Sequence, residues 1–151
     1  MSNETPRLPA TRGEIAALVP HQMAMCLLDF VKECTEDGIL CGTRSHACPD
    51  NPLRHHGRLA ALHLCEYGAQ AMAVHGGLSS SRAVLIPRPG LLAAVRNVEL
   101  WVDSVDPSGT LEVRARRVHG NAAGWQYDFA VDQDGRRLAA GRAIVMVPRT
   151  A

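Results

Sequence analysis

The sequence predicts an α+β protein in which one curved antiparallel sheet wraps around a single long buried helix. Residues 59–74 are apolar nearly all the way round, which is typical of a helix enclosed by other structure. Only strand patterns follow that helix, and a helix followed by a meander of strands favours packing on one face of a sheet. With 151 residues, 46% of them hydrophobic, the chain suits one domain. We place this domain at residues 13–148, after a flexible N-terminal segment of residues 1–12.

Before the central helix, the pattern predicts a short helix and a hairpin. Residues 11–19 are helical in pattern, because Thr11 can cap the helix and Glu14 follows three residues later. Strands at 25–31 and 39–44 flank a turn and form the hairpin, and a loop spans residues 45–57. We expect the central helix to end at Gly76 and Gly77, because glycine favours the left-handed conformation after a helix.

Four strands are expected after the central helix, and they make up the rest of the sheet. They cover residues 91–102, 110–119, 125–132 and 137–147. In the second of them, apolar and charged residues alternate, as in a half-buried strand. Its Arg114, Arg116 and Arg117 are expected to face solvent, with docking of an acidic carrier protein as the alternative.

Composition argues against several classes of function. The net charge of +1 gives no indication of nucleic acid or an anionic membrane as partner, and no apolar run is long enough for a transmembrane helix. Five cysteines without a CxxC pair, together with the lack of a signal-peptide pattern, favour a reducing cytoplasm. The seven histidines lack metal-ligand spacing, so we expect no metal and no other cofactor.

Within the apolar helix, three polar side chains share one stripe: His63, Glu66 and Gln70. A carboxylate in such a helix is costly unless it is paired, hydrogen-bonded or used in chemistry. Glu66 is therefore either a catalytic acid or a buried carboxylate held by a neighbouring group. Gln70 is expected to orient Glu66 or bind a loop, and His63 either contacts Glu66 or is satisfied inside the core.

Two stretches of sequence resemble a known family. The chain has Leu18-Val19-Pro20-His21 followed by Leu27-Leu28-Asp29-Phe30-Val31, and its central helix reads Leu64-Cys65-Glu66-Tyr67-Gly68-Ala69-Gln70-Ala71. These stretches, with the order of elements over residues 13–148, resemble the hotdog-fold beta-hydroxyacyl-ACP dehydratases of fatty-acid synthesis. The resemblance is closer to the divergent dehydratase-like proteins of aryl-polyene clusters. It places Glu66 on the catalytic carboxylate of the family.

One family motif, Gly-His-Phe-Pro-Gly, is absent, and Pro52 stands where its histidine is expected. By order and context, His56 with Gly57 is assigned to the catalytic base, with His55 or His63 as alternatives. His21 is expected to shape a turn, and His75 and His119 to face solvent.

The resemblance implies dehydration of (3R)-3-hydroxyacyl thioesters on an acyl carrier protein, in fatty-acid or aryl-polyene biosynthesis. Glu66 would be the acid, His56 the base, and backbone N–H groups at 57–60 would hold the thioester carbonyl. Leu91, Leu92 and Ala93 are expected to line an acyl tunnel. Because hotdog subunits pair edge to edge and share active sites, a homodimer or larger assembly is implied, or a heteromer with another hotdog subunit.

Two other functions stay open. The chain could be a non-catalytic or partner-dependent hotdog subunit that binds acyl-carrier protein, because the histidine motif departs from the family. It could also be a hotdog acyl-thioesterase, in which Glu66 activates water or attacks the thioester.

Overall fold

The computed structural model describes residues 7–19, 25–82 and 90–148. In chain order the helices and strands are α1 (Arg12–Ala16), β1 (Phe30–Cys34), β2 (Gly38–Thr43), the 3-10 turns η2 (Ser45–Ala47) and η3 (Ala61–His63), α2 (Leu64–Arg82), β3 (Leu91–Leu100), β4 (Leu111–Asn121), β5 (Gly124–Gln133) and β6 (Arg136–Met146). All of β1 to β6 join one antiparallel sheet, in the order β1-β2-β4-β5-β6-β3.

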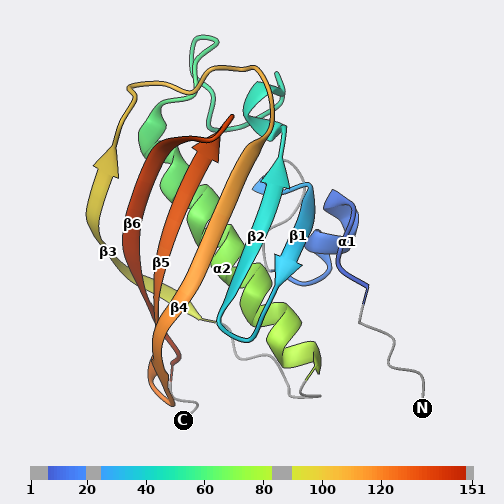
Figure 1. Ribbon diagram of the computed structural model, residues 1–151, viewed down its shortest axis with the longest axis vertical. Helices are drawn as coiled ribbons and strands as arrows, with labels where there is room; N and C mark the ends of the chain where they lie inside the picture. The colour runs from blue at the N-terminus through green and yellow to red at the C-terminus, as the bar shows by residue number, and fades with distance from the viewer. Residues whose placement is uncertain (1–6, 20–24, 83–89, 149–151) are drawn as a thin grey trace.

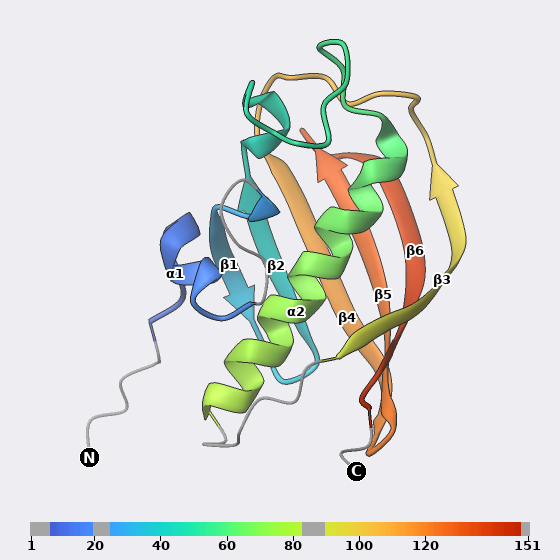
Figure 2. The same cartoon turned by 180° about the vertical axis from the view of Figure 1, so that it is seen from behind.

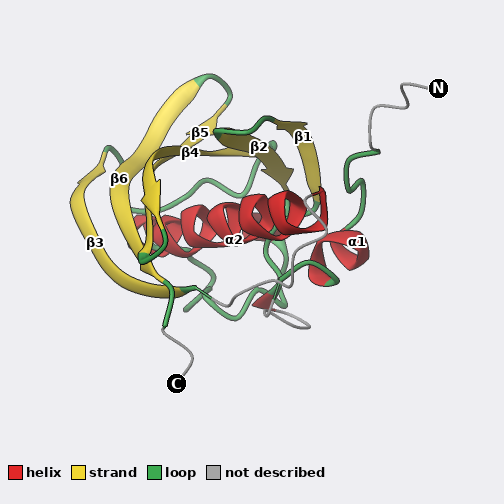
Figure 3. Cartoon of the chain, turned by 90° about the horizontal axis from the view of Figure 1, so that it is seen from below, coloured by secondary structure: helices red, strands yellow, loops and turns green. Residues whose placement is uncertain are grey.

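The sheet curves around α2, which runs across its concave face (Figures 1 and 2). Seen along another axis, the strands form an arc with α2 inside it (Figure 3). The predicted α+β architecture, with one long helix held by a curved antiparallel sheet, is confirmed. Strand β3 forms one edge of this sheet, because among the described residues it pairs only with β6.

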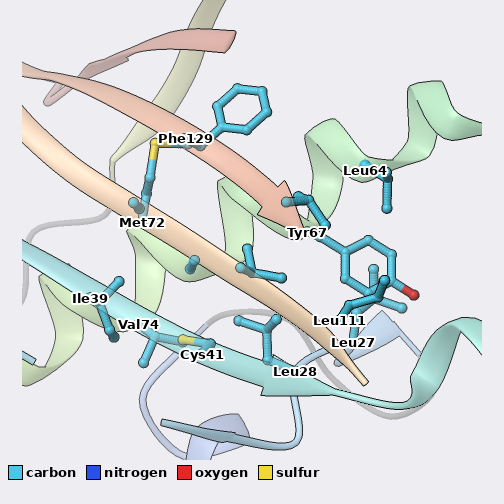
Figure 4. Packing of buried hydrophobic residues seen from close by; sticks show 14 of the residues in the cluster. Leu27, Leu28, Ile39, Cys41, Leu64, Tyr67, Met72, Val74, Leu111 and Phe129 are labelled. Atoms are coloured by element: carbon cyan, nitrogen blue, oxygen red, sulfur yellow. The ribbon is translucent and has the colours of Figure 1, made fainter. Parts of the chain in front are cut away.

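Alternation along the strands decides which side chains face α2. In β4, Leu111, Val113 and Ala115 are fully buried, whereas Arg114 and Arg116 are exposed. Figure 4 shows how the inward residues of the strands meet those of α2. The buried side chains labelled there are Leu27, Leu28, Ile39, Cys41, Leu64, Tyr67, Met72, Val74, Leu111 and Phe129.

The central helix lies further along the chain than the sequence predicts. It begins at Leu64, because the preceding residues pair with the segment after β3: the Ala61 N–H donates to the Asp103 carbonyl (3.0 Å). It also continues through the expected stop at Gly76 and Gly77. A Cβ on Gly77 would lie 2.6 Å from the Leu18 carbonyl oxygen, so this glycine allows close packing instead of ending the helix.

The first strand is also shifted, to Phe30–Cys34 instead of residues 25–31. Leu27 and Leu28 are buried, but the backbone of Leu27 bonds to side chains, and a β-ladder therefore does not form there. Residues before α1 also contact this edge, since the Val31 N–H donates to the Pro9 carbonyl (2.8 Å).

Candidate functional site

Glu66 lies in the first turn of α2 and is half-buried, with Gln70 one turn further along the helix. The Gln70 amide nitrogen donates to Glu66 Oε1 (3.1 Å) and to the Met25 carbonyl (2.6 Å). Its oxygen accepts from the Leu27 N–H (2.9 Å). Because that N–H fixes the position of the amide oxygen, the NH2 group must face Glu66. Gln70 therefore contacts both Glu66 and residues 25–27, a segment that the sequence analysis expected to be part of a strand.

A buried chain of hydrogen bonds fixes the loop after β2 to the same part of α2. The Asn51 amide donates to the Tyr67 hydroxyl (3.0 Å), which lies 2.9 Å from Ser45 Oγ. Ser45 in turn donates to the Leu27 carbonyl (2.6 Å), so Tyr67 donates to Ser45 and accepts from Asn51. Burial raises the pKa of the Tyr67 phenol, which keeps it a neutral donor. The sequence analysis missed this network, although a tyrosine next to Glu66 in an apolar helix was a signal for it.

His55 and His56 lie in an exposed turn of the loop before α2. The His55 N–H donates to the Arg58 carbonyl (2.8 Å), and the Arg58 N–H donates to the His55 carbonyl (3.0 Å). His56 and Gly57 both have positive φ, at 49° and 74°, and the two histidine rings are 4.1 Å apart. Within the part of the chain that is described, no hydrogen bond joins His55 or His56 to Glu66.

His46, in η2, is a buried histidine to which the sequence analysis assigned no role. Its side chain is 1% exposed, and its Nε2 lies 3.0 Å from the Ser108 carbonyl. A carbonyl can only accept, so Nε2 carries the proton and Nδ1 keeps its lone pair. Among the described residues, Nδ1 has no hydrogen-bond partner. In a neutral ring, the Nε2 of His46 is thus the donor and Nδ1 the acceptor. No motif around His46 in the sequence indicates this contact.

The remaining histidines differ in their surroundings. His119 is exposed, as expected, while His21 lies outside the described residues, and His63 is half-buried in η3. The prediction that His75 faces solvent is wrong. His75 is fully buried, and both of its ring nitrogens have partners there: Nδ1 accepts from the Tyr127 hydroxyl (2.8 Å) and Nε2 donates to the Thr35 carbonyl (3.0 Å). Burial lowers the pKa of its imidazole.

The expected thioester cradle and acyl tunnel are not enclosed within one chain. Residues 57–60 are not the start of the helix, and the Arg58 N–H is already bonded to His55. Leu91 and Leu92, at 60% and 48% exposed, lie with Ala93 on the edge strand β3.

The described ranges hold no cluster of three or more His, Cys, Asp or Glu side chains that could share a metal ion. No described helix is long and apolar enough to cross a membrane.

A comparison with protein-family models gives one decisive result. The model described as ApeP-like, ApeP dehydratase, matches residues 13–151. The chain belongs to the ApeP-like dehydratase family. A comparison of this ApeP-like chain with curated proteins finds no match.

Solved structures similar to this ApeP-like chain support the same fold. The dehydratase heterocomplex ApeI:P from Xenorhabdus doucetiae contains a chain with a TM-score of 0.82 and 19% identity, over 90% of this chain and 91% of that one. The PaaI protein of the E. coli phenylacetic acid degradation operon has a TM-score of 0.60 and 14% identity, over 89% and 88%. A hypothetical thioesterase from Streptococcus pneumoniae with coenzyme A has a TM-score of 0.58 and 11% identity, over 78% and 86%. The predicted hotdog fold is confirmed.

Proposed function

We propose that this protein dehydrates (3R)-3-hydroxyacyl thioesters carried by an acyl carrier protein, in fatty-acid or aryl-polyene biosynthesis. The observation that carries the proposal is Glu66. This carboxylate sits at the start of the central helix of a dehydratase-family hotdog fold, and Gln70 holds it in one orientation. No cofactor is needed, because elimination of water from a 3-hydroxyacyl thioester requires only a base, an acid and a polarised carbonyl.

In this proposal the base removes a proton from C2 and Glu66 protonates the hydroxyl on C3. The C2–H electron pair forms the C2=C3 double bond as the C3–O bond breaks, which releases water and leaves the enoyl thioester intact. The base then holds one proton and Glu66 has lost one, so transfer of a proton back to Glu66 resets the site. Backbone N–H groups near the start of α2 would stabilise the enolate character of the carbonyl.

We assign the base to His56, which lies in an exposed turn where contact with an adjoining subunit would be required. His46 is the competing candidate, because its tautomer is fixed by Ser108 and its Nδ1 has no partner among the described residues. The two histidines differ in exposure, because His46 is buried within its own chain and His56 is exposed. Substituting each of them separately tests the two assignments.

We propose that the active form contains at least two hotdog subunits joined along β3, either two copies of this chain or this chain and another hotdog subunit. Every residue of β3 except Ala94 and Val95 is exposed, and these include Leu91, Leu92 and Val98. A long apolar edge strand favours pairing with a second chain. The ApeI:P structure is itself a heterocomplex, which supports the heteromer. Pairing there would cover Leu91, Leu92 and Ala93 and close the proposed acyl tunnel.

Two alternative functions would give different results in an activity assay. A partner-dependent subunit would be inert alone and would raise activity only with another hotdog chain. A thioesterase would release free thiol, and the solved structure of a hypothetical thioesterase does share this fold. We also propose that the protein acts in the cytoplasm.

The test is incubation of the purified protein, alone and with a second hotdog subunit, with 3-hydroxyacyl-carrier thioesters. Mass spectrometry follows the loss of one water from the carrier-bound chain, and a thiol reagent detects hydrolysis. We expect water loss that falls at least about a hundredfold in Glu66→Gln, since removing a general acid costs 10²–10⁴-fold. His56→Ala and His46→Ala identify the base by which of them loses activity. Full activity in Glu66→Gln, or thiol release in place of water loss, would refute the proposal.

A further inference from the structure

The turn between Arg54 and Arg58 projects past the strands at the end of the molecule where α2 begins (Figures 1 and 2). His55 and His56 are exposed in this turn, and His56 and Gly57 both have positive φ. Outside glycine a positive φ is uncommon and costs conformational energy, so it persists only where the surrounding structure holds it. The turn therefore needs contacts that fix its shape.

The side chain of Arg54 provides such contacts. Its Nη1 donates to the His46 carbonyl (3.0 Å), and its Nη2 donates to the Gly57 carbonyl (2.9 Å). The nitrogens of a guanidinium are fixed in one plane, so these two bonds set both the distance and the direction between the two carbonyls. We call this pair of hydrogen bonds the Arg54 clamp. It joins η2 to the residue that follows His56.

The clamp attaches the turn to a part of the molecule that is itself held in place. His46 is 1% exposed, and its ring bonds to the Ser108 carbonyl (3.0 Å). The residue before it, Ser45, bonds to the Tyr67 hydroxyl (2.9 Å). Tyr67 follows Glu66 in the first turn of α2. The clamp therefore ties the exposed turn to the same framework that carries Glu66.

The other end of the turn is anchored separately. Arg58 donates from Nη2 to Ser104 Oγ (3.1 Å), and Ala60 pairs with Ser104 in an isolated bridge. These contacts fix the chain where it leaves the turn, but they do not involve η2. Within the described ranges, the hydrogen-bonded link between the turn and η2 consists of the Arg54 clamp.

A general base must lie within hydrogen-bonding reach of the proton that it removes. In the proposed reaction His56 acts from an exposed turn, and a displacement of about 1 Å can cost a hundredfold in rate. We propose that Arg54 is a positioning residue for His56, because its clamp holds the turn in the conformation from which the His56 ring reaches the C2 proton. This inference rests on the proposed function, since His56 is the base assigned there.

The test replaces Arg54 by lysine, which keeps the charge but cannot reproduce the planar pair of bonds with its single nitrogen. The matched control is Arg44→Lys, at the start of the same loop. Arg44 bonds through its side chain to Thr110 Oγ1 (3.3 Å), a contact that a lysine can also make. We expect Arg54→Lys to lower kcat by about ten- to a hundredfold, with little change in KM or in the melting temperature. The control should leave kcat unchanged.

A double-mutant cycle shows whether Arg54 acts through His56. In the His56→Ala background, Arg54→Lys should cause no further loss of rate. The clamp also contacts His46, so the cycle is repeated with His46→Ala, where the loss should persist. Unchanged kcat in Arg54→Lys, a loss that persists beside His56→Ala, or a loss that disappears beside His46→Ala would overturn the assignment.

Amide hydrogen exchange tests the clamp without turnover. In Arg54→Lys the His55 and Arg58 N–H groups, which bond across the turn, should exchange faster than in wild type, and in Arg44→Lys they should exchange as in wild type. Unaltered exchange in Arg54→Lys would overturn the proposal even if kcat falls. A wild-type protein that converts no substrate, alone or with a second hotdog subunit, would refute the proposed function and with it the role of His56. The exchange result would still decide whether Arg54 holds the turn.

Discussion

Replacement of Gln70 by leucine is the sharpest test of how the site is held. Gln70 is 2% exposed and makes three hydrogen bonds, to Glu66, Met25 and Leu27. Leucine fits the space closely but can neither donate nor accept. The Leu27 N–H, in a residue only 1% exposed, would then be buried without its partner, and the Met25 carbonyl would lose a donor.

The expected cost follows from those two groups. An orphaned buried N–H costs about 1–3 kcal/mol, and the half-buried Met25 carbonyl adds about 1 kcal/mol at most. We therefore expect Gln70→Leu to lower the free energy of unfolding by about 1–4 kcal/mol. For a domain of this size, that lowers the melting temperature by roughly 2–16 °C.

Urea unfolding followed by circular dichroism measures this change. The control is Gln126→Leu, the same substitution at a half-buried position on β5 whose side chain makes no hydrogen bond with described residues, and it should cost under about 0.5 kcal/mol. If Gln70→Leu is as stable as this control, Gln70 does not bridge the Glu66 turn and residues 25–27, and the account of the site is wrong.

Three further outcomes are expected. Because the pKa of buried His75 is lowered, the unfolded chain binds more protons, so stability is full above about pH 6.5 and falls below it. Urea midpoints between pH 7.5 and pH 5 should show a smaller fall for His75→Gln than for wild type, and identical slopes would contradict this. Tyr67→Phe should cost about 1–2 kcal/mol in thermal unfolding, because Asn51 and Ser45 lose their shared partner; an unchanged melting temperature would show that the network adds nothing. Leu92→Asp/Leu100→Asp should convert the assembly to monomers in light scattering, since like charges would meet at β3, and an unchanged mass would exclude this edge as the interface.

The architecture could be predicted from sequence because it depends on local patterns. The alternation in β4 and the largely apolar stretch of residues 59–74 are local features of the sequence, and they favour a sheet with a helix on one face. The boundaries could not be predicted so well. A glycine can end a helix or allow another segment to pack closely against it. At Gly77 the close contact with Leu18 is the reason for the glycine, and α2 continues.

The sequence by itself also determined that Glu66 and Gln70 face the same way, since their spacing places them on one helix stripe. Only the tertiary structure decided the surroundings of the histidines. It buried His75 against Tyr127 and gave His46 a fixed tautomer through Ser108, partners that lie 52 and 62 residues away in the chain. Burial and hydrogen bonding at such separations depend on how distant segments meet, and a local pattern of residues does not contain that information.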